Sequence, residues 1–270
     1  MRLPLLATAL LLLPATACAQ SHPSRTLADD AWCEDAEGRG DRVVACEVRE
    51  TVLRTDALDV TVMNGALTVT EWDRPDVLVR ARVVATADDE AVAWRRVRET
   101  TVSTTEGLIR AEAPRHRDGS ASVSFEIFAP KATDLTAAAL NGPVHVEGLD
   151  GTIRATATNG PVCLVKLSGD VEVNATNGPV SIDLRGDAWT GSGLAVHATN
   201  GPITMDLPAR YSARLMAETA QGPIVAPGLH TLRGRGGRGD RLDATLGAGG
   251  GLLTLDAHNG PVRIRTSEGS

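Results

Sequence analysis

The chain has 270 residues, 42% of them hydrophobic, so it is long and apolar enough to bury a core. Its formal net charge of -7 argues against nucleic-acid binding, which depends on a basic surface. Four Trp, two Phe and one Tyr are the only aromatic residues, while 27 residues are Gly and 14 are Pro. This composition predicts an aliphatic core and many turns.

Residues 1–19 are predicted to be a signal peptide. Arg2 supplies a basic start, and the apolar run that follows, 3–13, is too short to span a bilayer. The small residues around Cys18 offer a cleavage site that leaves Gln20 as the new N-terminus. No transmembrane segment is predicted after residue 20, so the expected product is exported, either periplasmic or secreted.

Cys18 leaves a second possibility open. Thr16-Ala17-Cys18 resembles a lipobox, in which the cysteine is acylated and anchors the protein to a membrane. Ala15 stands where such motifs usually carry a large aliphatic residue, so the soluble product is favoured slightly over a lipoprotein.

Residues 20–50 are expected to form an N-terminal cap held by a disulfide between Cys33 and Cys46. The two cysteines flank a short polar stretch, and export would place them in an oxidising compartment. Such a bond stabilises the fold by about 3 kcal/mol in the chain-entropy model. No His or third Cys lies nearby to complete a zinc site, so neither a metal nor a cofactor is predicted.

Residues 51–132 show strand-like alternation with less regularity, interrupted by one helix over 88–100. Asp88 is the expected N-cap of this helix. The apolar stripe predicted to face the core consists of Ala91, Trp94 and Val97, with Val92 as a further candidate.

Residues 133–267 repeat one phrase, Asn-Gly-Pro followed by Val or Ile, between alternating apolar and polar positions. The first intervals between copies are 18, 18 and 23 residues. Fixed spacing is typical of a solenoid or array. The turn residues are Asn141, Asn159, Asn177, Asn200 and Asn259, with Gln221 as a variant and Asn64 as an early degenerate copy.

Two all-β arrangements fit this repeat. Asn-Gly between alternating strands is a strong hairpin signal, which would give an antiparallel meander. Pro after Gly removes a backbone donor where a hairpin ladder would begin, so a parallel β-solenoid of 18–23-residue coils is favoured. The recurring Asn side chains are then expected to stack at one corner and hydrogen-bond to each other as structure, not as a ligand site.

The exported start, the segment "WCEDAEGRGDRVVACEVRE", the segment "TVTEWDRPDVLVRA" and the serial Asn-Gly turns together resemble the bacterial putative-adhesin family. The likeness covers about residues 32–266. It implies a β-solenoid on or near the cell envelope and supplies no catalytic residues. Several relatives carry Asn-Gly-Gly where this chain has Asn-Gly-Pro. The proline is expected to stiffen the turn in this chain.

Asp183 and Asp206 are the best candidates for chemistry, since in-register coils would place them one coil apart. Close carboxylates serve as acid and base in glycosidases or hold calcium. A solvated acidic face is the favoured interpretation, because aromatic platforms for sugars are nearly absent. Cys163 is expected on the outer face as an exposed thiol in the same row as His145, without a third group to make it a nucleophile.

Arg233, Arg235 and Arg238 lie in a predicted exposed loop over 233–240 and are weak candidates for contact with anionic lipid or polysaccharide. Arg-Gly-Asp occurs three times, beginning at Arg39, Arg185 and Arg238, and is held only as a minor adhesion determinant.

The sequence therefore predicts an exported, non-enzymatic β-solenoid that acts as an adhesin or cell-envelope interaction protein. The expected partner is an unknown protein or glycan at the envelope, with a lipid anchor through Cys18 as an option. One alternative is a polysaccharide hydrolase or lyase on the same scaffold. The other is a periplasmic scaffold or stress-associated envelope factor that binds a partner through open strand edges.

Overall fold

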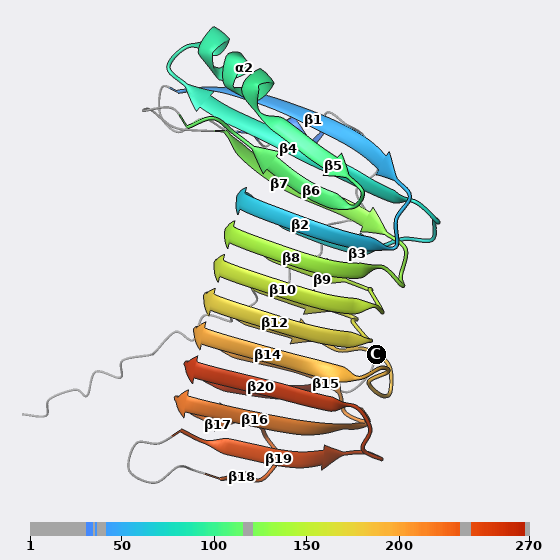
Figure 1. Cartoon of the computed structure of the whole chain (residues 1–270). Helices are drawn as coiled ribbons and strands as arrows, with labels where there is room; N and C mark the ends of the chain where they lie inside the picture. The colour runs from blue at the N-terminus through green and yellow to red at the C-terminus, as the bar shows by residue number, and fades with distance from the viewer. Residues whose placement is uncertain (1–30, 35, 37–41, 116–120, 233–238, 268–270) are drawn as a thin grey trace, which may run out of the picture.

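The protein is described here by a computed structural model that covers residues 31–34, 36, 42–115, 121–232 and 239–267. The predicted signal peptide 1–19, Cys18 and the three loop arginines Arg233, Arg235 and Arg238 lie outside these residues. Two large mixed sheets stack face to face along an elongated body (Figure 1). The prediction of an all-β protein is confirmed.

The first sheet has ten strands. In spatial order they are β1 (Val43–Leu53), β4 (Val77–Ala87), β7 (Ser122–Ala129), β3 (Leu67–Glu71), β9 (Val144–Glu147), β11 (Val162–Val165), β13 (Val180–Asp183), β15 (Ile203–Pro208), β21 (Val262–Ser267) and β17 (Ile224–Val225).

The second sheet has eleven strands. In spatial order they are β18 (Thr231–Leu232), β19 (Arg241–Leu246), β16 (Ala213–Gln221), β20 (Leu252–Asn259), β14 (Gly193–Asn200), β12 (Asp170–Asn177), β10 (Thr152–Asn159), β8 (Asp134–Asn141), β2 (Ala57–Asn64), β6 (Leu108–Glu112) and β5 (Thr101–Thr105).

In the middle of the body each repeat unit consists of a long strand in the second sheet, an Asn-Gly turn and a short strand in the first sheet. Neighbouring units pair in parallel and in register, so that Ile153 lies beside Val171 and Asn159 beside Asn177, eighteen residues later. The short strands follow the same rule, with Val162 beside Val180. The interval between copies of the repeated phrase in the sequence thus equals the offset between paired residues in the two sheets.

The core lies between the two sheets and is almost entirely aliphatic. Side chains alternate along every central strand, so Ile153, Ala155 and Ala157 on β10 are each at most 3% exposed. The short strand of a unit supplies branched residues such as Val180 and Ile182, also buried. Small alanines on one sheet facing larger residues on the other allow the two layers to pack closely.

The order of units in space departs from their order in the chain at both ends. The last unit, β20 with β21, lies between the β14–β15 unit and the β16–β17 unit (Figure 1). At the other end, β2 and β3 lie between β6–β7 and β8–β9. Sequence spacing does not reveal this order, because every unit offers the same backbone groups to a parallel neighbour.

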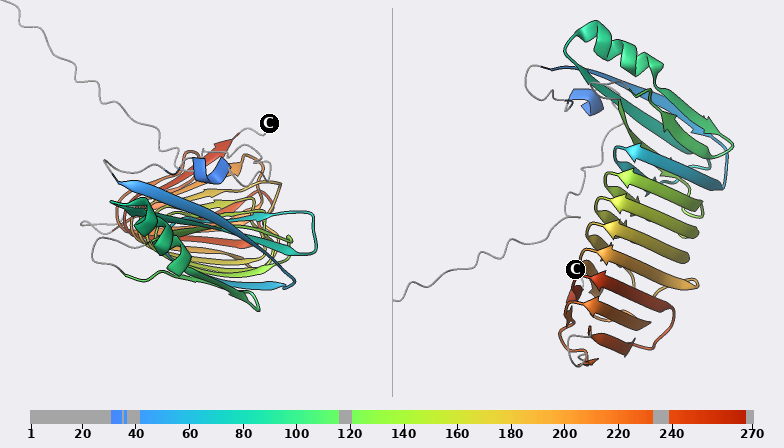
Figure 2. Two further views of the ribbon diagram at one scale, coloured as in Figure 1. Left: turned by 90° about the horizontal axis from the view of Figure 1, so that it is seen from above. Right: turned by 60° about the vertical axis from the view of Figure 1, so that its left-hand side comes forward.

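Antiparallel strands and the longer helix close the N-terminal end. β1, β4 and β7 pair antiparallel, and α2 (Glu90–Glu99) lies against β1 and β4 (Figure 2). Arg80 on β4 is only 2% exposed and donates to Glu50 at 2.6 Å and to Glu126. The two carboxylates come from the flanking strands, so the buried cation is paired on both sides.

The helix runs over Glu90–Glu99 instead of the predicted 88–100, with Asp89 instead of Asp88 as its N-cap. The Asp89 carboxylate accepts from the backbone N–H of Val92 at 3.2 Å. The predicted apolar stripe is right for Val97 and partly for Val92, which packs against the core, but wrong for Trp94, 37% exposed, and for Ala91, which is exposed; the helix buries Ala93 and Arg96 instead. Arg96 donates to the carbonyl of Thr86 on β4. This hydrogen bond gives a partner to the guanidinium group of Arg96, which is buried where the pattern predicted Trp94.

The predicted disulfide is confirmed. Cys33 and Cys46 are bonded, with their Cα atoms 5.7 Å apart. The bond ties the short helix α1 (Ala31–Glu34) to β1 (Figure 2).

The glycine of each central Asn-Gly turn lies directly against the same glycine of the next unit. Gly160 has φ +146°, and a Cβ atom there would lie 2.2 Å from the carbonyl oxygen of Gly142. Its N–H donates to the carbonyl of Asn177 at 2.9 Å, on the other neighbouring unit. Only glycine lets the backbones approach this closely at this dihedral angle.

We therefore expect Gly160→Ala to lower the free energy of unfolding by about 2–4 kcal/mol, through the clash and the backbone strain together. Gly186→Ala is the control: its φ is +79°, but nothing lies within 4 Å of an added Cβ. It should cost only about 1–2 kcal/mol. Denaturant unfolding measures both variants, and equal losses would show that the close turn contact is unimportant.

Candidate functional site

The turn asparagines form a continuous hydrogen-bonded ladder along one edge of the body. Each Nδ2 donates to the Oδ1 of the asparagine in the neighbouring unit, at 2.9–3.0 Å, and all five bonds run in the same direction. From donor to acceptor they are Asn141 to Asn64, Asn159 to Asn141, Asn177 to Asn159, Asn200 to Asn177 and Asn259 to Asn200. The expectation that these side chains stack and bond to one another is confirmed.

The two ends of this asparagine ladder are chemically different. Asn64 accepts from Asn141, but its own Nδ2 has no acceptor among the described residues. At the other end, the Oδ1 of Asn259 receives no hydrogen bond from the described part of Gln221, although the two residues are in register. The ladder therefore presents a donor at its Asn64 end and an acceptor at its Asn259 end, and aligned amides polarise one another in this sense.

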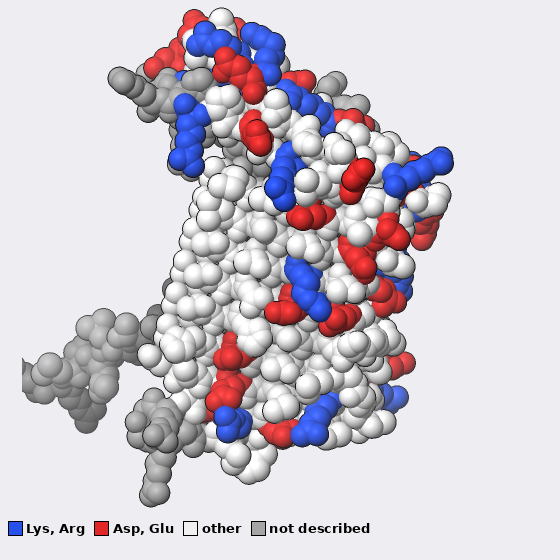
Figure 3. Space-filling view, in the orientation of Figure 1, with Lys and Arg blue, Asp and Glu red and all other residues white. Residues whose placement is uncertain are grey.

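On the outer face of the second sheet, the strand positions next to the ladder carry no charged side chain in four consecutive units. This neutral band follows the last outward positions of β2, β8, β10 and β12, on the left of the face seen in Figure 3. Its side chains are small or polar, with two exposed apolar ones at the β2 end. They are Thr61, Met63, Ala138, Leu140, Thr156, Thr158, Asn174 and Thr176.

The charged groups of the same face lie outside the neutral band. Arg154 donates to Asp170 at 2.7 Å, and further along the stack Asp256 and Glu218 lie side by side as an acidic pair. Arg241 pairs with Glu218 at 2.7 Å. Most charges of this face are thus neutralised locally, and the neutral band is left as an uninterrupted polar surface.

Asp183 and Asp206 lie side by side on β13 and β15 of the first sheet, as the register predicts. Partial burial raises the pKa of Asp206, and the charge of Asp183 adds to this, while Arg265 and Arg185 oppose it. Asp183 accepts from Arg185 at 2.7 Å. The pair therefore has guanidinium groups on both sides, and neither carboxylate lines either of the two pockets described below.

Cys163 is not the exposed thiol that the sequence predicts. It lies in register with His145, as expected, but it is only 8% exposed, so it does not offer an accessible thiol at the surface. Within the described ranges, no group of three or more His, Cys, Asp and Glu residues is placed to hold a metal ion.

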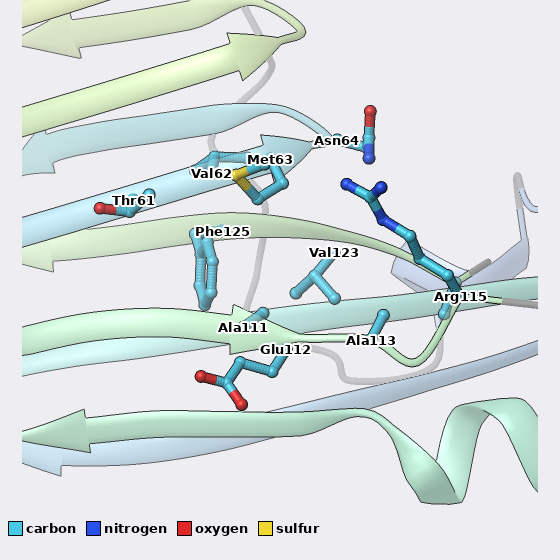
Figure 4. Close-up of a pocket in the computed structure, with 11 residues that line it drawn as sticks. Thr61, Val62, Met63, Asn64, Ala111, Glu112, Ala113, Arg115, Val123 and Phe125 are labelled. Atoms are coloured by element: carbon cyan, nitrogen blue, oxygen red, sulfur yellow. The ribbon is translucent and has the colours of Figure 1, made fainter.

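A pocket of about 320 Å³ opens at the Asn64 end of the ladder, and sequence reasoning missed it (Figure 4). β6 pairs with β2 only over Asp59–Thr61, and beyond Thr61 the two strands diverge. This ladder-end pocket fills the gap between β2, β6 and β7. Its walls include Met63, Ala111, Ala113, Val123 and Phe125, with Asn64, Arg115 and Glu112 as its polar residues.

A second pocket, of about 760 Å³, lies at the opposite edge of the sheets among the turns that follow β1, β3 and β7. Arg54, Asp56 and Asp76 give it mixed charge. The Oδ1 of Asp76 and the Oγ1 of Thr133 are buried there without a hydrogen-bond partner in the described part of the chain. Mixed charge of this kind selects no ligand class.

Comparisons with known proteins give only distant likenesses among solved structures. No family model and no curated protein matches the chain. Among solved structures, a putative cell adhesion protein from Clostridium sporogenes is 13% identical with a TM-score of 0.43, covering 82% of this chain and 100% of that chain. A putative adhesin from Bacteroides fragilis is 11% identical with a TM-score of 0.38, covering 82% and 97%.

A putative lipid binding protein from Parabacteroides distasonis is 9% identical with a TM-score of 0.31, covering 82% and 97%. The first two names agree with the resemblance to the putative-adhesin family that the sequence predicts. With TM-scores below 0.5, these likenesses decide nothing about the site. In the described ranges no helix is long and apolar enough to cross a membrane.

The direction of the asparagine ladder can be tested with carboxylates, which accept hydrogen bonds but do not donate them. Asn177→Asp removes the donor to Asn159 and sets two acceptors against each other, so it should cost about 1–2 kcal/mol in denaturant unfolding. Asn64→Asp is the matched control, because Asn64 only accepts within the ladder, and its cost should be below about 0.5 kcal/mol. A larger loss for Asn64→Asp would reverse the assigned direction.

The raised pKa of Asp206 predicts a pH-dependent stability difference. Its proton is bound more tightly in the folded state, so its contribution to stability is full at acid pH and is lost as the pH rises through the folded pKa. Asp206→Asn should therefore match the wild type near pH 3 and exceed it in unfolding midpoint near pH 7. A midpoint gain that is the same at both pH values would contradict this origin.

Proposed function

We propose that this protein is an exported parallel β-solenoid that binds an extended, uncharged partner at the cell envelope through the neutral band and does not catalyse a reaction. The neutral band is the single observation that carries the proposal: four consecutive units present uncharged Thr, Ala, Asn, Leu and Met side chains beside a continuous row of amides. A neutral glycan chain is the partner whose chemistry suits this surface best.

The spacing of the surface supports a polymeric partner. Parallel strands stand about 4.8 Å apart, so equivalent side chains recur at that interval along the body. Within the ladder, Asn159, Asn177 and Asn200 each use one N–H and one lone pair of the amide for their neighbours and keep the second of each, whereas Asn141 also donates to the carbonyl of Met63 at 3.3 Å. A chain of hydroxyl groups meets such an array with many weak hydrogen bonds, none of which requires a charge.

The remaining assignments belong to the same proposal. Residues 1–19 direct export and residues 20–50 form the disulfide-linked cap, with residues 51–132 and 133–267 as the irregular and regular parts of the solenoid. Cys18 is the site of a lipid anchor if the N-terminus is acylated instead of cleaved after residue 19. Arg233, Arg235 and Arg238 serve as a secondary contact for anionic groups.

A hydrolase is the second candidate, and the adjacent carboxylates of Asp183 and Asp206 are the observation that favours it. The raised pKa of Asp206 would suit a general acid beside an ionised partner. Two observations argue against a hydrolase. Arginine side chains lie close to the two carboxylates, and neither carboxylate lines either pocket. A third candidate, an envelope scaffold, would use the edge strands β1 and β5, each paired on one side only in the described residues.

The test uses the mature chain, residues 20–270, on an array of neutral and acidic glycans, peptidoglycan and matrix proteins, with released sugar assayed in parallel. The double variant Thr156→Arg with Thr176→Arg places two charges in the neutral band and should weaken neutral-glycan binding at least tenfold. Thr152→Arg, on the same face of β10 but outside the band, is the control and should bind as the wild type does.

Binding that both arginine variants leave unchanged would contradict the neutral band as the surface. Binding to a protein alone, lost on altering β1 or β5, would favour the scaffold. Sugar release that disappears in Asp183→Asn, with the fold intact, would replace the proposal with the hydrolase.

A further inference from the structure

We propose that the ladder-end pocket is a binding site for a small amphipathic carboxylate, such as a fatty acid of short or medium length. The carboxylate would lie between Arg115 and the side-chain amide of Asn64, and the apolar body would pack against Phe125 and Val123. This site adjoins the β2 end of the neutral band and shares Thr61 and Met63 with it, but its binding chemistry does not depend on the function proposed for the band.

Two donors meet at the mouth of the pocket, and the described residues place no acceptor between them. In Figure 4 the Nδ2 of Asn64 and the guanidinium of Arg115 point toward one another. Neither group donates to an acceptor in the described residues, and Arg115 makes no ion pair there. Two N–H groups that face each other repel unless an anion or a water bridges them, and a carboxylate offers oxygen atoms to both.

The ladder adds to the donor strength of Asn64. Five amide hydrogen bonds point the same way, and Asn64 is the terminal acceptor of the chain. Cooperative polarisation strengthens the N–H at this end of such a chain, which favours a negatively charged ligand. The opposite end of the ladder presents an acceptor and would not attract an anion.

The inner part of the pocket is apolar. Phe125 is 1% exposed and Val123 is 6% exposed, and Ala111 and Ala113 line the side formed by β6. Met63, 46% exposed, lies at the rim and continues onto the neighbouring exposed Leu140. A linear apolar chain can enter along this wall and cover surface that otherwise faces water.

The charge of the site fits a single anionic group. Glu112 is the one acidic residue among those lining the pocket, and its carboxylate points away from Arg115 (Figure 4). A phosphate or a polyanion would bring more charge than one guanidinium neutralises. A volume of about 320 Å³ is at the small end of the range of about 300–1,000 Å³ that ligand pockets span, which favours a short body.

The experiment titrates the mature chain with sodium octanoate by isothermal titration calorimetry, beside 1-octanol and a hexapeptide that ends in a free leucine carboxylate. Octanoate should bind saturably at one site, and octanol, which keeps the chain and lacks the carboxylate, at least tenfold more weakly. Arg115→Gln should weaken octanoate at least tenfold. Arg210→Gln removes the same charge from an exposed position far from the pocket and should change nothing.

Asn64→Asp gives an independent arm, because it keeps the ladder bond and sets a carboxylate against the ligand. It should abolish octanoate binding while the unfolding midpoint stays unchanged. Equal affinity for octanol and octanoate, or full affinity in Arg115→Gln, would overturn the proposal. Tighter binding of the free hexapeptide than of octanoate, lost on amidating its C-terminus, would assign the same carboxylate site to protein C-termini instead of fatty acids.

Discussion

The whole stack depends on the contact between one Asn-Gly turn and the next. The N–H of each central turn glycine donates to the carbonyl of the asparagine in the neighbouring unit, at 2.8 Å for Gly142 and 2.9 Å for Gly160. Since a Cβ at Gly160 would clash with a carbonyl oxygen, the turns stack only as glycines. This contact fixes the register, and the register brings the asparagine side chains within hydrogen-bond distance. The amide ladder is therefore a consequence of backbone packing as much as a cause of it.

The hydrogen bonds in this ladder of primary amides all run in one direction, so the two ends of the ladder present different polar groups. A parallel stack of identical units would otherwise present the same polar groups at each end. The donor end is at Asn64, where the strands also diverge: β6 pairs with β5 along its whole length but with β2 only as far as Thr61. A regular scaffold thus acquires a distinct site at the position where its repetition stops.

Sequence periodicity was sufficient for the parts of the molecule that repeat. The alternation around Asn159 and Asn177 predicted the strands, the buried faces and the one-unit separation of Asp183 and Asp206. It was less accurate for the helix, where the buried face lies about 100° of helical rotation, one residue, from the predicted one and brings Arg96 inward in place of Trp94. The ladder-end pocket was also missed, because it brings together residues far apart in the chain, such as Met63 and Ala121, 58 positions apart, and depends on strand divergence that no local pattern encodes.

The exchanged order of units at both ends follows from the same repetition. Asn200 hydrogen-bonds to Asn259, 59 residues away, with the same 2.9 Å geometry that joins consecutive units. One unit is as good a neighbour as another so long as its turn carries Asn-Gly and its inward positions are aliphatic. Gln221, whose longer side chain does not extend the ladder, occupies the outer unit, so the order chosen keeps all six asparagines contiguous. The inward positions therefore accept only a narrow set of residues, whereas the outward positions on the strands can vary. A partner-specific surface can develop at these outward positions without disturbing the fold.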